Sequence, residues 1–356
     1  MGRMKRAQFL AALAALVLMS AGSLLTKGQA PAATHAPAPQ LVILDTDIGD
    51  DIDDAFALAL VLRSPELELL GVTTAFGDTE LRAKLVERFL RAEGRIDISV
   101  GAGVRTAETT HFTQMAYAKQ PFDSLADICT TRLLMTSQLP VPKRVQDQYD
   151  ACEKDRHDGV EFLLGQIRAH PGQITLIAIG PLTNVGAAIQ RDPATFKKLK
   201  RVVIMGGSVY RGYGDKPTPP APEWNILCDP AGAKALFGSG VPVFVMPLDS
   251  TQIHLENEAL GAIFSHGSTL TDQLTLLYHQ WSGAKEWRSP TLFDPVAVTY
   301  AIRPDLCPAK PMRLEVDDKG FTIPIQGVPN VQVCLQSDER GFLELLLGRI
   351  ATETAP

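Results

Sequence analysis

The most chemically suggestive stretch of the chain is LDTDIGDDIDD, residues 44–54, in which six of eleven residues are aspartate. The aspartates are Asp45, Asp47, Asp50, Asp51, Asp53 and Asp54. They stand between the apolar segments LVIL and AFALALVL, where water is scarce and like charges repel strongly. Asp53 and Asp54 fall at the expected start of a helix, where backbone N–H groups and the helix dipole stabilise negative charge. That stabilises one or two carboxylates, so six of them indicate a bound divalent cation.

The residue types around this cluster favour calcium or magnesium over zinc, because the ligands would be hard oxygens without a nearby Cys or His. A solvated acidic loop that caps a helix is the alternative interpretation. The density of carboxylates directly after an apolar strand favours the metal site. An EF-hand is excluded, because no twelve-residue loop ends in Glu and the flanking segments are a strand and a helix.

The elements that must position this cluster alternate between apolar strands and amphipathic helices. Strands are expected at residues 41–45, 67–77, 97–103, 174–180, 201–207 and 241–249, with strand-like alternation at 312–336. Helices are expected at residues 55–64, 79–94, 158–172, 181–190, 229–240 and 338–350, with two or three more before residue 303. The pattern predicts an α/β fold with a mostly parallel central sheet covered by helices on both faces. In such a sheet ligands bind beyond the carboxyl ends of the strands, which is where the aspartates lie.

The domain organisation is expected to be simple. Residues 41–350 show no internal repeat and no boundary, so they predict one domain. Within it, residues 105–156 are rich in Gln, Thr and Met and lack a clear period, which indicates an insertion or a lid over a site.

The N-terminus predicts export. Residues 1–30 have a basic start, an apolar run and small residues near Ala30, which is typical of a signal peptide, and residues 31–40 form a Pro/Ala linker. An uncleaved membrane anchor is the alternative. We therefore expect a periplasmic or secreted protein. Its net charge of −6 and the lack of a basic stripe argue against binding to nucleic acid or, after signal cleavage, to a membrane.

Five cysteines are present, and this odd number excludes a complete disulfide framework. No pair has the spacing of metal ligands. Cys129 and Cys152 flank one unusual segment and could pair outside the cytoplasm, and two buried free thiols are the alternative.

The chain resembles the inosine-uridine preferring nucleoside hydrolases, whose signature is Asp-x-Asp-Pro-Gly-x-Asp-Asp-Ala after the first strand. Here the signature stands as DTDIGDDIDDA, with Ile48 in place of proline and two additional residues before the final pair. The resemblance continues through GVTTAFGDT, ITLIAIGPLTN, VVIMGGSVY, PAPEWNILCDPAGAKALFGSGVPV and LFDPVAVTYAI, over roughly residues 40–350.

The resemblance implies a calcium-dependent enzyme that hydrolyses ribonucleosides to base and ribose, and it allows a homo-oligomer. The implied Ca²⁺ ligands are Asp47, Asp54, the backbone carbonyl of Ile179 and Asp294. The implied substrate-binding residues are Asp53, Asp78, Glu223, Asn225 and Phe293. This register anchors the final aspartate pair on Ala55, and Asp50 with Asp51 is the alternative pair.

The residue types suit this chemistry. Breaking an N-glycosidic bond builds positive charge on the ribose, and a wall of carboxylates stabilises that charge. The resemblance implies that a calcium-bound water attacks and that Asp47 takes its proton as general base. Asp45, at the strand end, is expected to be structural.

The base side of the expected site departs from the family pattern. Phe293 replaces a histidine that serves many members as general acid, and Asp78 replaces a common Asn. Asp78 is expected either to contact ribose or to cap the following helix. Candidate proton donors or stacking groups for the base are His111, Tyr213, His254, Trp281 and Trp287.

Two other functions compete. A phosphatase of the haloacid dehalogenase type also begins with a strand and Asp-x-Asp, but its later Lys and Asp-Asp elements do not appear in order. A periplasmic protein that binds a nucleoside or sugar without turnover would explain the loss of the acid at Phe293.

Overall fold

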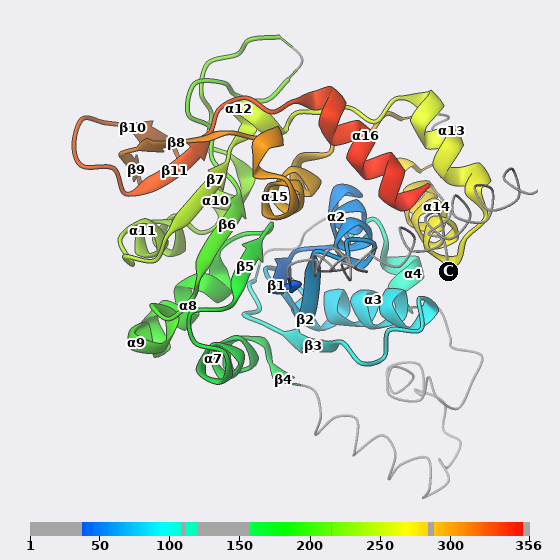
Figure 1. Cartoon of the computed structure of the whole chain (residues 1–356), viewed down its shortest axis with the longest axis horizontal. Coiled ribbons are helices and arrows are strands. Elements are labelled where there is room, and N and C mark those ends of the chain that lie inside the picture. Colours follow the sequence, from blue (N-terminus) through cyan, green and yellow to red (C-terminus); the bar gives the residue numbers. More distant parts are fainter. Residues whose placement is uncertain (1–37, 108–111, 120–156, 215, 284–287, 352–356) are drawn as a thin grey trace, which may run out of the picture. The chain divides into compact units, whose positions relative to one another are not determined.

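A twisted sheet runs through the part of the chain that the computed structural model describes, which is residues 38–107, 112–119, 157–214, 216–283 and 288–351 (Figure 1). Within these residues the sheet has nine strands in the order β4-β3-β2-β1-β5-β6-β7-β11-β8. Every neighbouring pair is parallel except β11 and β8. The strands are β1 Gln40–Thr46, β2 Leu67–Thr74, β3 Ser99–Ala102, β4 His157–Asp158, β5 Thr175–Ala178, β6 Arg201–Met205, β7 Val243–Met246, β8 Ala309–Met312 and β11 Val331–Cys334. Strands β9 (Leu314–Val316) and β10 (Thr322–Pro324) form a separate antiparallel pair.

Helices cover both faces of the sheet (Figure 1). One layer contains α7 Gly159–Ala169, α8 Thr183–Arg191, α9 Pro193–Phe196 and α11 Pro230–Phe237. The other contains α2 Asp53–Leu62, α3 Thr79–Ala92, α13 Asn257–His266, α14 Thr269–Ser282, α15 Phe293–Ile302 and α16 Glu339–Ile350. Short helices α4 Met115–Lys119, α10 Trp224–Cys228, α12 Leu248–Thr251 and the 3-10 turn Pro304–Leu306 lie in the connections. Each layer packs its apolar side chains into a separate core, so the predicted mostly parallel α/β fold is confirmed.

The position of β1 explains where the site forms. β1 lies between β2 and β5, so the chain winds outward through β2 and β3 on one side and through β5, β6 and β7 on the other. A crevice opens at such a switch point, beyond the carboxyl ends of the two central strands. The aspartate-rich segment leaves β1 directly into that crevice.

Helix α2 begins at Asp53, two residues before the expected Ala55, so Asp53 and Asp54 lie at the helix start as predicted; its residues from Asp53 to Val61 are buried. Its Ala- and Leu-rich sequence is apolar all round, which suits a helix enclosed by other elements. The helix ends at Leu62, and Pro65 follows because proline disfavours a continued helix.

Several features differ from the expectations or lie outside the described residues. Four helices, not two or three, fill the region between β7 and residue 303, and α4 lies inside the segment expected to lack a period. A disulfide joins Cys307 to Cys334, with Cα atoms 5.6 Å apart, a pair that the sequence spacing did not indicate. The signal peptide, most of the linker, and Cys129 and Cys152 lie outside the described residues. Among the described helices, none combines the length and apolar character needed to cross a membrane.

Candidate active site

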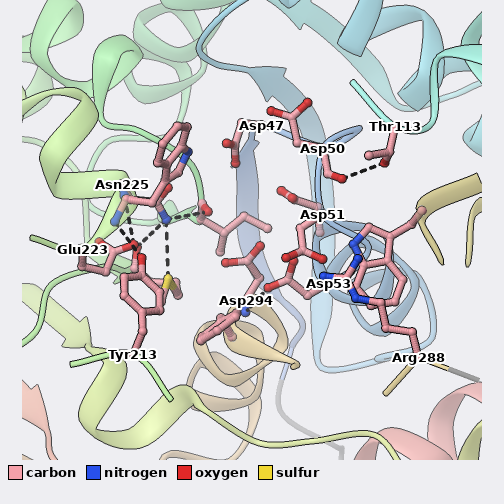
Figure 2. A pocket seen from close by; sticks show the side chains of 16 residues that line it. Asp47, Asp50, Asp51, Asp53, Thr113, Tyr213, Glu223, Asn225, Arg288 and Asp294 are labelled. Carbon is pink, nitrogen blue, oxygen red and sulfur yellow. Dashed lines mark hydrogen bonds between the residues drawn. The ribbon is translucent and has the colours of Figure 1, made fainter. Parts of the chain in front are cut away.

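A cavity of about 460 Å³ opens at the carboxyl ends of β1, β5 and β6 (Figure 2). Its lining includes eight of the nine predicted site residues: Asp47, Asp53, Asp54, Ile179, Glu223, Asn225, Phe293 and Asp294. These residues come from the loop after β1, the first turn of α2, the end of β5, α10 and the start of α15. The topology therefore gathers segments that are distant in the sequence at one point.

The centre of the cavity is a group of three carboxylates, from Asp53, Asp54 and Asp294. One oxygen from each lies within 4.8 Å of the others, and the three residues are only 3%, 3% and 4% exposed. Asp53 Oδ2 accepts a hydrogen bond from the backbone N of Asp294 at 3.2 Å, and Asp54 accepts one from the Thr46 hydroxyl. The structure thus groups Asp294 with Asp53 and Asp54, and not with Asp50 and Asp51, which were the alternative pair.

Burial dominates the electrostatics of these carboxylates. It raises the pKa of Asp53, Asp54 and Asp294 well above the usual value, and repulsion from neighbouring aspartates adds to the shift. Burial also raises the pKa of Asp47 to about 7, with Arg82 opposing the shift and Asp50 adding to it. Such a set of buried oxygens, with neither sulfur nor imidazole in the group, fits a hard divalent cation that would compensate its charge.

Helix α10 builds a second wall. Glu223 caps it: Oε1 accepts from Asn225 N at 2.9 Å, and Oε2 accepts from Gly207 N at 2.8 Å and Ile226 N at 3.2 Å. Burial raises the pKa of Glu223 to about 7. Asn225 Nδ2 donates to the carbonyl oxygen of Ile179 at 2.9 Å, and that oxygen keeps a second lone pair for another partner.

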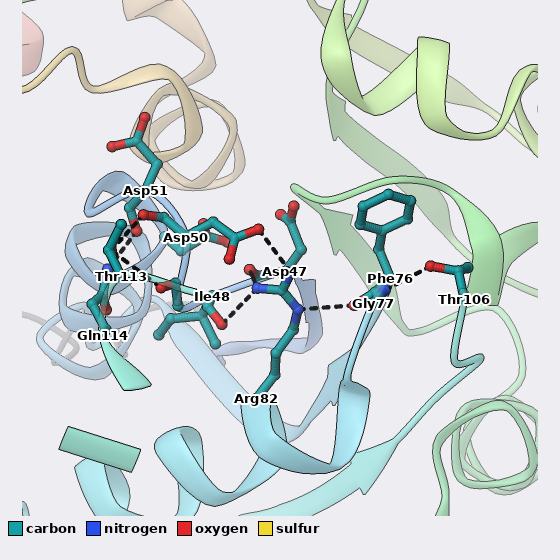
Figure 3. A network of polar contacts seen from close by, with 12 residues as sticks. Asp47, Ile48, Asp50, Asp51, Phe76, Gly77, Arg82, Thr106, Thr113 and Gln114 are labelled. Carbon is teal, nitrogen blue, oxygen red and sulfur yellow. Dashed lines mark hydrogen bonds and ion pairs between the residues drawn. The ribbon is translucent and has the colours of Figure 1, made fainter. Parts of the chain in front are cut away.

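Arg82 of α3 lies beneath the aspartate loop and is fully buried (Figure 3). Its Nε donates to Phe76 O at 2.8 Å, Nη1 donates to Ile48 O at 3.0 Å and to Asp47 O, and Nη2 contacts Asp50 at 2.9 Å. Sequence analysis missed this residue. The signal was available, because Arg82 shares the helical spacing of the buried residues Leu85, Val86 and Phe89.

The two additional residues of the loop are held from a second direction. Thr113 Oγ1 donates to Asp50 O at 2.7 Å, and Gln114 Nε2 donates to Asp51 O at 2.7 Å. Gln114 N also donates to Gly49 O at 3.1 Å. These bonds fix the loop backbone so that the Asp51 side chain lines the cavity.

Aromatic residues and one arginine complete the cavity. Tyr213 and Phe293 make an edge contact with ring centroids 6.2 Å apart, and the Arg288 guanidinium lies 4.1 Å from the ring centre of Trp281. Of the proposed donors and stacking groups, Tyr213 and Trp281 line the cavity, whereas His254 pairs with Thr291 outside its lining. His111 and Trp287 lie outside the described residues. Sequence analysis did not single out Arg288, which has no distinctive motif around it.

Asp78 does not line this cavity. Its side chain accepts a hydrogen bond from Leu81 N at 3.2 Å as the cap of α3, and it lies 3.5 Å from Arg105. The structure therefore shows the cap and corrects the assignment of Asp78 to substrate binding, because the carboxylate turns back onto its own helix. Asp45 is structural, as predicted: it is buried and accepts hydrogen bonds from Thr73 and Asn184.

Comparison with known proteins agrees with this geometry. The family model described as inosine-uridine preferring nucleoside hydrolase matches residues 42–344. Uridine nucleosidase 1 of Arabidopsis thaliana is 30% identical over 289 residues, which are 79% of this chain and 80% of that protein. The pyrimidine-specific ribonucleoside hydrolase RihA of Citrobacter koseri is 30% identical over 332 residues, which cover 87% of this chain and 97% of that protein.

Solved structures show the same relationship. A plant nucleoside hydrolase superposes with a TM-score of 0.70 at 26% identity, over 88% of this chain and 100% of the other. A purine-preferring ribonucleoside hydrolase from Gardnerella vaginalis gives a TM-score of 0.65 at 25% identity, over 88% of this chain and 98% of the other. The chain belongs to the inosine-uridine preferring nucleoside hydrolases, a family of enzymes that act on the N-glycosidic bond.

Proposed function

We propose that the protein hydrolyses ribonucleosides to free base and ribose. The observation that carries the proposal is the convergence of Asp47, Asp53, Asp54, Asp294 and Glu223 in one buried cavity. As the bond to the base breaks, the ribose gains positive charge, which a wall of carboxylates stabilises. A cavity of this size and composition accommodates a small ligand and selects a cationic transition state.

We propose Ca²⁺ as the cofactor, held by Asp47, Asp54, Asp294 and the carbonyl oxygen of Ile179. The buried, oxygen-only group of carboxylates supports the choice of a hard cation and includes two of these ligands, Asp54 and Asp294, together with Asp53. Asp47 lines the same cavity. When bound, the ion supplies positive charge that orients ribose hydroxyls and a water molecule and makes that water more acidic.

The chain's own residues then have separate roles. Asp47 accepts the proton of the attacking water, and its backbone is held by Arg82, which limits its motion. Asp53 and Asn225 bind ribose hydroxyls, and Glu223 binds the 5′ side of the sugar. Relatives named for pyrimidines and for purines share the fold, so the choice of base depends on the end of the cavity that contacts the base.

We also propose that the protein acts in the periplasm or outside the cell. The Cys307–Cys334 disulfide supports this location, because disulfides persist in oxidising compartments. The composition of the N-terminal thirty residues supports it as well.

A panel of ribonucleosides, incubated with and without EDTA, tests the proposal through the release of free ribose. We expect turnover that EDTA abolishes and added Ca²⁺ restores, and that Asp47→Asn lowers by about 10²–10⁴-fold. Asp305→Asn is the matched control, because Asp305 pairs with Arg303 at the surface. Tight binding of a ribonucleoside without ribose release would favour a binding protein, and turnover that persists after verified metal removal would contradict the role of calcium.

A further inference from the structure

The cavity has two ends, with the carboxylate centre between them. Figure 2 shows Glu223, Asn225 and Tyr213 on one side, Arg288 on the opposite side, and Asp53 and Asp294 between them. In a nucleoside, C5′ and the base project from opposite ends of the ribose ring. If Glu223 binds the 5′ side, as proposed above, the base must point toward Arg288.

Arg288 is positioned at that end by two neighbours. Its guanidinium lies 4.1 Å from the ring centre of Trp281, a cation–π contact. Asp51 attracts Arg288 and accepts a hydrogen bond from Trp281, and both interactions favour the charged carboxylate against the effect of its burial. Among the described residues that line the cavity, Arg288 is the sole basic side chain.

The departure of the base places a chemical requirement on the end of the cavity where Arg288 lies. When C1′–N breaks, the bonding electron pair moves to the base nitrogen, while a water oxygen bonds to C1′ and its proton passes to Asp47. The base must therefore either receive a proton as it leaves or depart as an anion that takes a proton from solvent afterwards. Phe293 cannot donate a proton. Tyr213 lies on the ribose 5′ side, and burial raises its pKa further above its ordinary value.

We propose that Arg288 is a catalytic residue that stabilises the departing base as an anion, replacing proton donation by a fixed positive charge. Its planar guanidinium is a delocalised cation that presents N–H donors to an acceptor that gains negative charge. Uracil suits this device, because its anion spreads charge over two carbonyl oxygens. Asp51 is a positioning residue, which gives the two-residue expansion of the aspartate loop a role.

This inference rests on the proposed function and is tested by comparing two leaving groups. The base of uridine is a poor leaving group unless its negative charge is stabilised, whereas 4-nitrophenyl β-D-riboside releases an anion that is stable by itself. For Arg288→Gln we expect kcat/KM for uridine to fall by about 10²-fold, the loss typical of one preorganised donor, while the value for the nitrophenyl riboside is unchanged. Arg288→Lys, which keeps the charge, and Asp51→Asn should each lose less on uridine and nothing on the nitrophenyl riboside.

Arg303→Gln is the matched control, because this arginine pairs with Asp305 at the surface, and it should alter neither substrate. Equal losses on both substrates, or no loss on uridine, would overturn the role of Arg288 and leave the proposed function standing. If Arg288→Gln shows no thermal unfolding transition, it does not fold, and the comparison of uridine with the nitrophenyl riboside is then made with Arg288→Lys. A wild-type protein that releases ribose from neither compound, nor from any other ribonucleoside, would contradict the proposed function itself.

Discussion

Arg82 Nη2 lies 2.9 Å from Asp50 Oδ2, so a fully buried cation is paired with the first residue of the expanded aspartate loop. The same guanidinium binds backbone carbonyls of that loop and of Phe76, in the turn after β2 (Figure 3). Arg82 thus offsets part of the negative charge around Asp47 and ties two loops together beneath the cavity.

Removing this cation should weaken the fold. Arg82→Met leaves Asp50 without its ion pair and buried carbonyl groups without a donor, so the free energy of unfolding should fall by about 3–5 kcal/mol. Urea denaturation measures this change. Arg95→Met, which breaks only a surface pair with Asp97, should change it by less than about 1 kcal/mol. Similar effects of the two substitutions would show that the buried network is not important for stability, and Asp50→Asn gives a milder test if Arg82→Met does not fold.

The raised pKa of Asp47 predicts how pH and calcium act on stability. Burial raises the pKa of Asp47 from its ordinary value of 3.8 to about 7, so the metal-free folded state binds more protons than the unfolded state between those values. Metal-free stability should therefore fall as pH rises through that interval. Calcium binds the deprotonated carboxylates, so the rise in Tm on adding Ca²⁺ should grow from about pH 5 to about pH 8.

Differential scanning fluorimetry with and without Ca²⁺ measures this difference. Asp54→Asn should abolish the rise in Tm, whereas Asp305→Asn should preserve it. A rise that is independent of pH would mean that the buried carboxylates do not release protons when calcium binds.

Binding of the ribose hydroxyls predicts discrimination against deoxynucleosides. A site built to hydrogen-bond a hydroxyl leaves buried polar groups unpaired when that hydroxyl is missing, so a 2′-deoxynucleoside should react about 10³-fold more slowly or worse. Sugar release from uridine and from 2′-deoxyuridine gives the comparison. Asp53→Ala should lower activity on uridine more than on its deoxy analogue, and equal rates on the two nucleosides would refute this arrangement.

The cap at Asp78 makes a distinct prediction. Asn is as good a helix N-cap as Asp, so Asp78→Asn should keep both stability and kcat/KM, whereas Asp78→Ala should lower stability by about 1 kcal/mol. Thermal unfolding and ribose release together test this. A loss of activity in Asp78→Asn at unchanged Tm would return Asp78 to the substrate site.

The disulfide predicts sensitivity to reduction. Cys307 and Cys334 are separated by 27 residues, and cross-linking a loop of this length typically stabilises a protein by about 2–4 kcal/mol. Cys307→Ser or treatment with a reductant should lower the free energy of unfolding by that amount. Cys228→Ser, outside this disulfide, is the control. An unchanged stability after reduction would show that the bond contributes little.

The sequence by itself determined the order of the elements and the nature of the cluster at residues 44–54. Apolar runs and helix-stop signals such as Ser64-Pro65 act on neighbouring residues, so β1, α2 and the position of Asp53 and Asp54 at a helix start could be predicted. The motifs also led to nine predicted site residues, of which eight line the cavity.

Tertiary structure alone decided which distant residues meet. Asp294 contacts Asp53 across 241 positions, Cys307 reaches Cys334, and Arg288 lies over Trp281. Such contacts depend on how helices and strands pack, and no local propensity encodes them. The same reason explains Asp78: its spacing allowed either a cap or a ribose contact, and only the direction of its carboxylate in the folded chain separates the two.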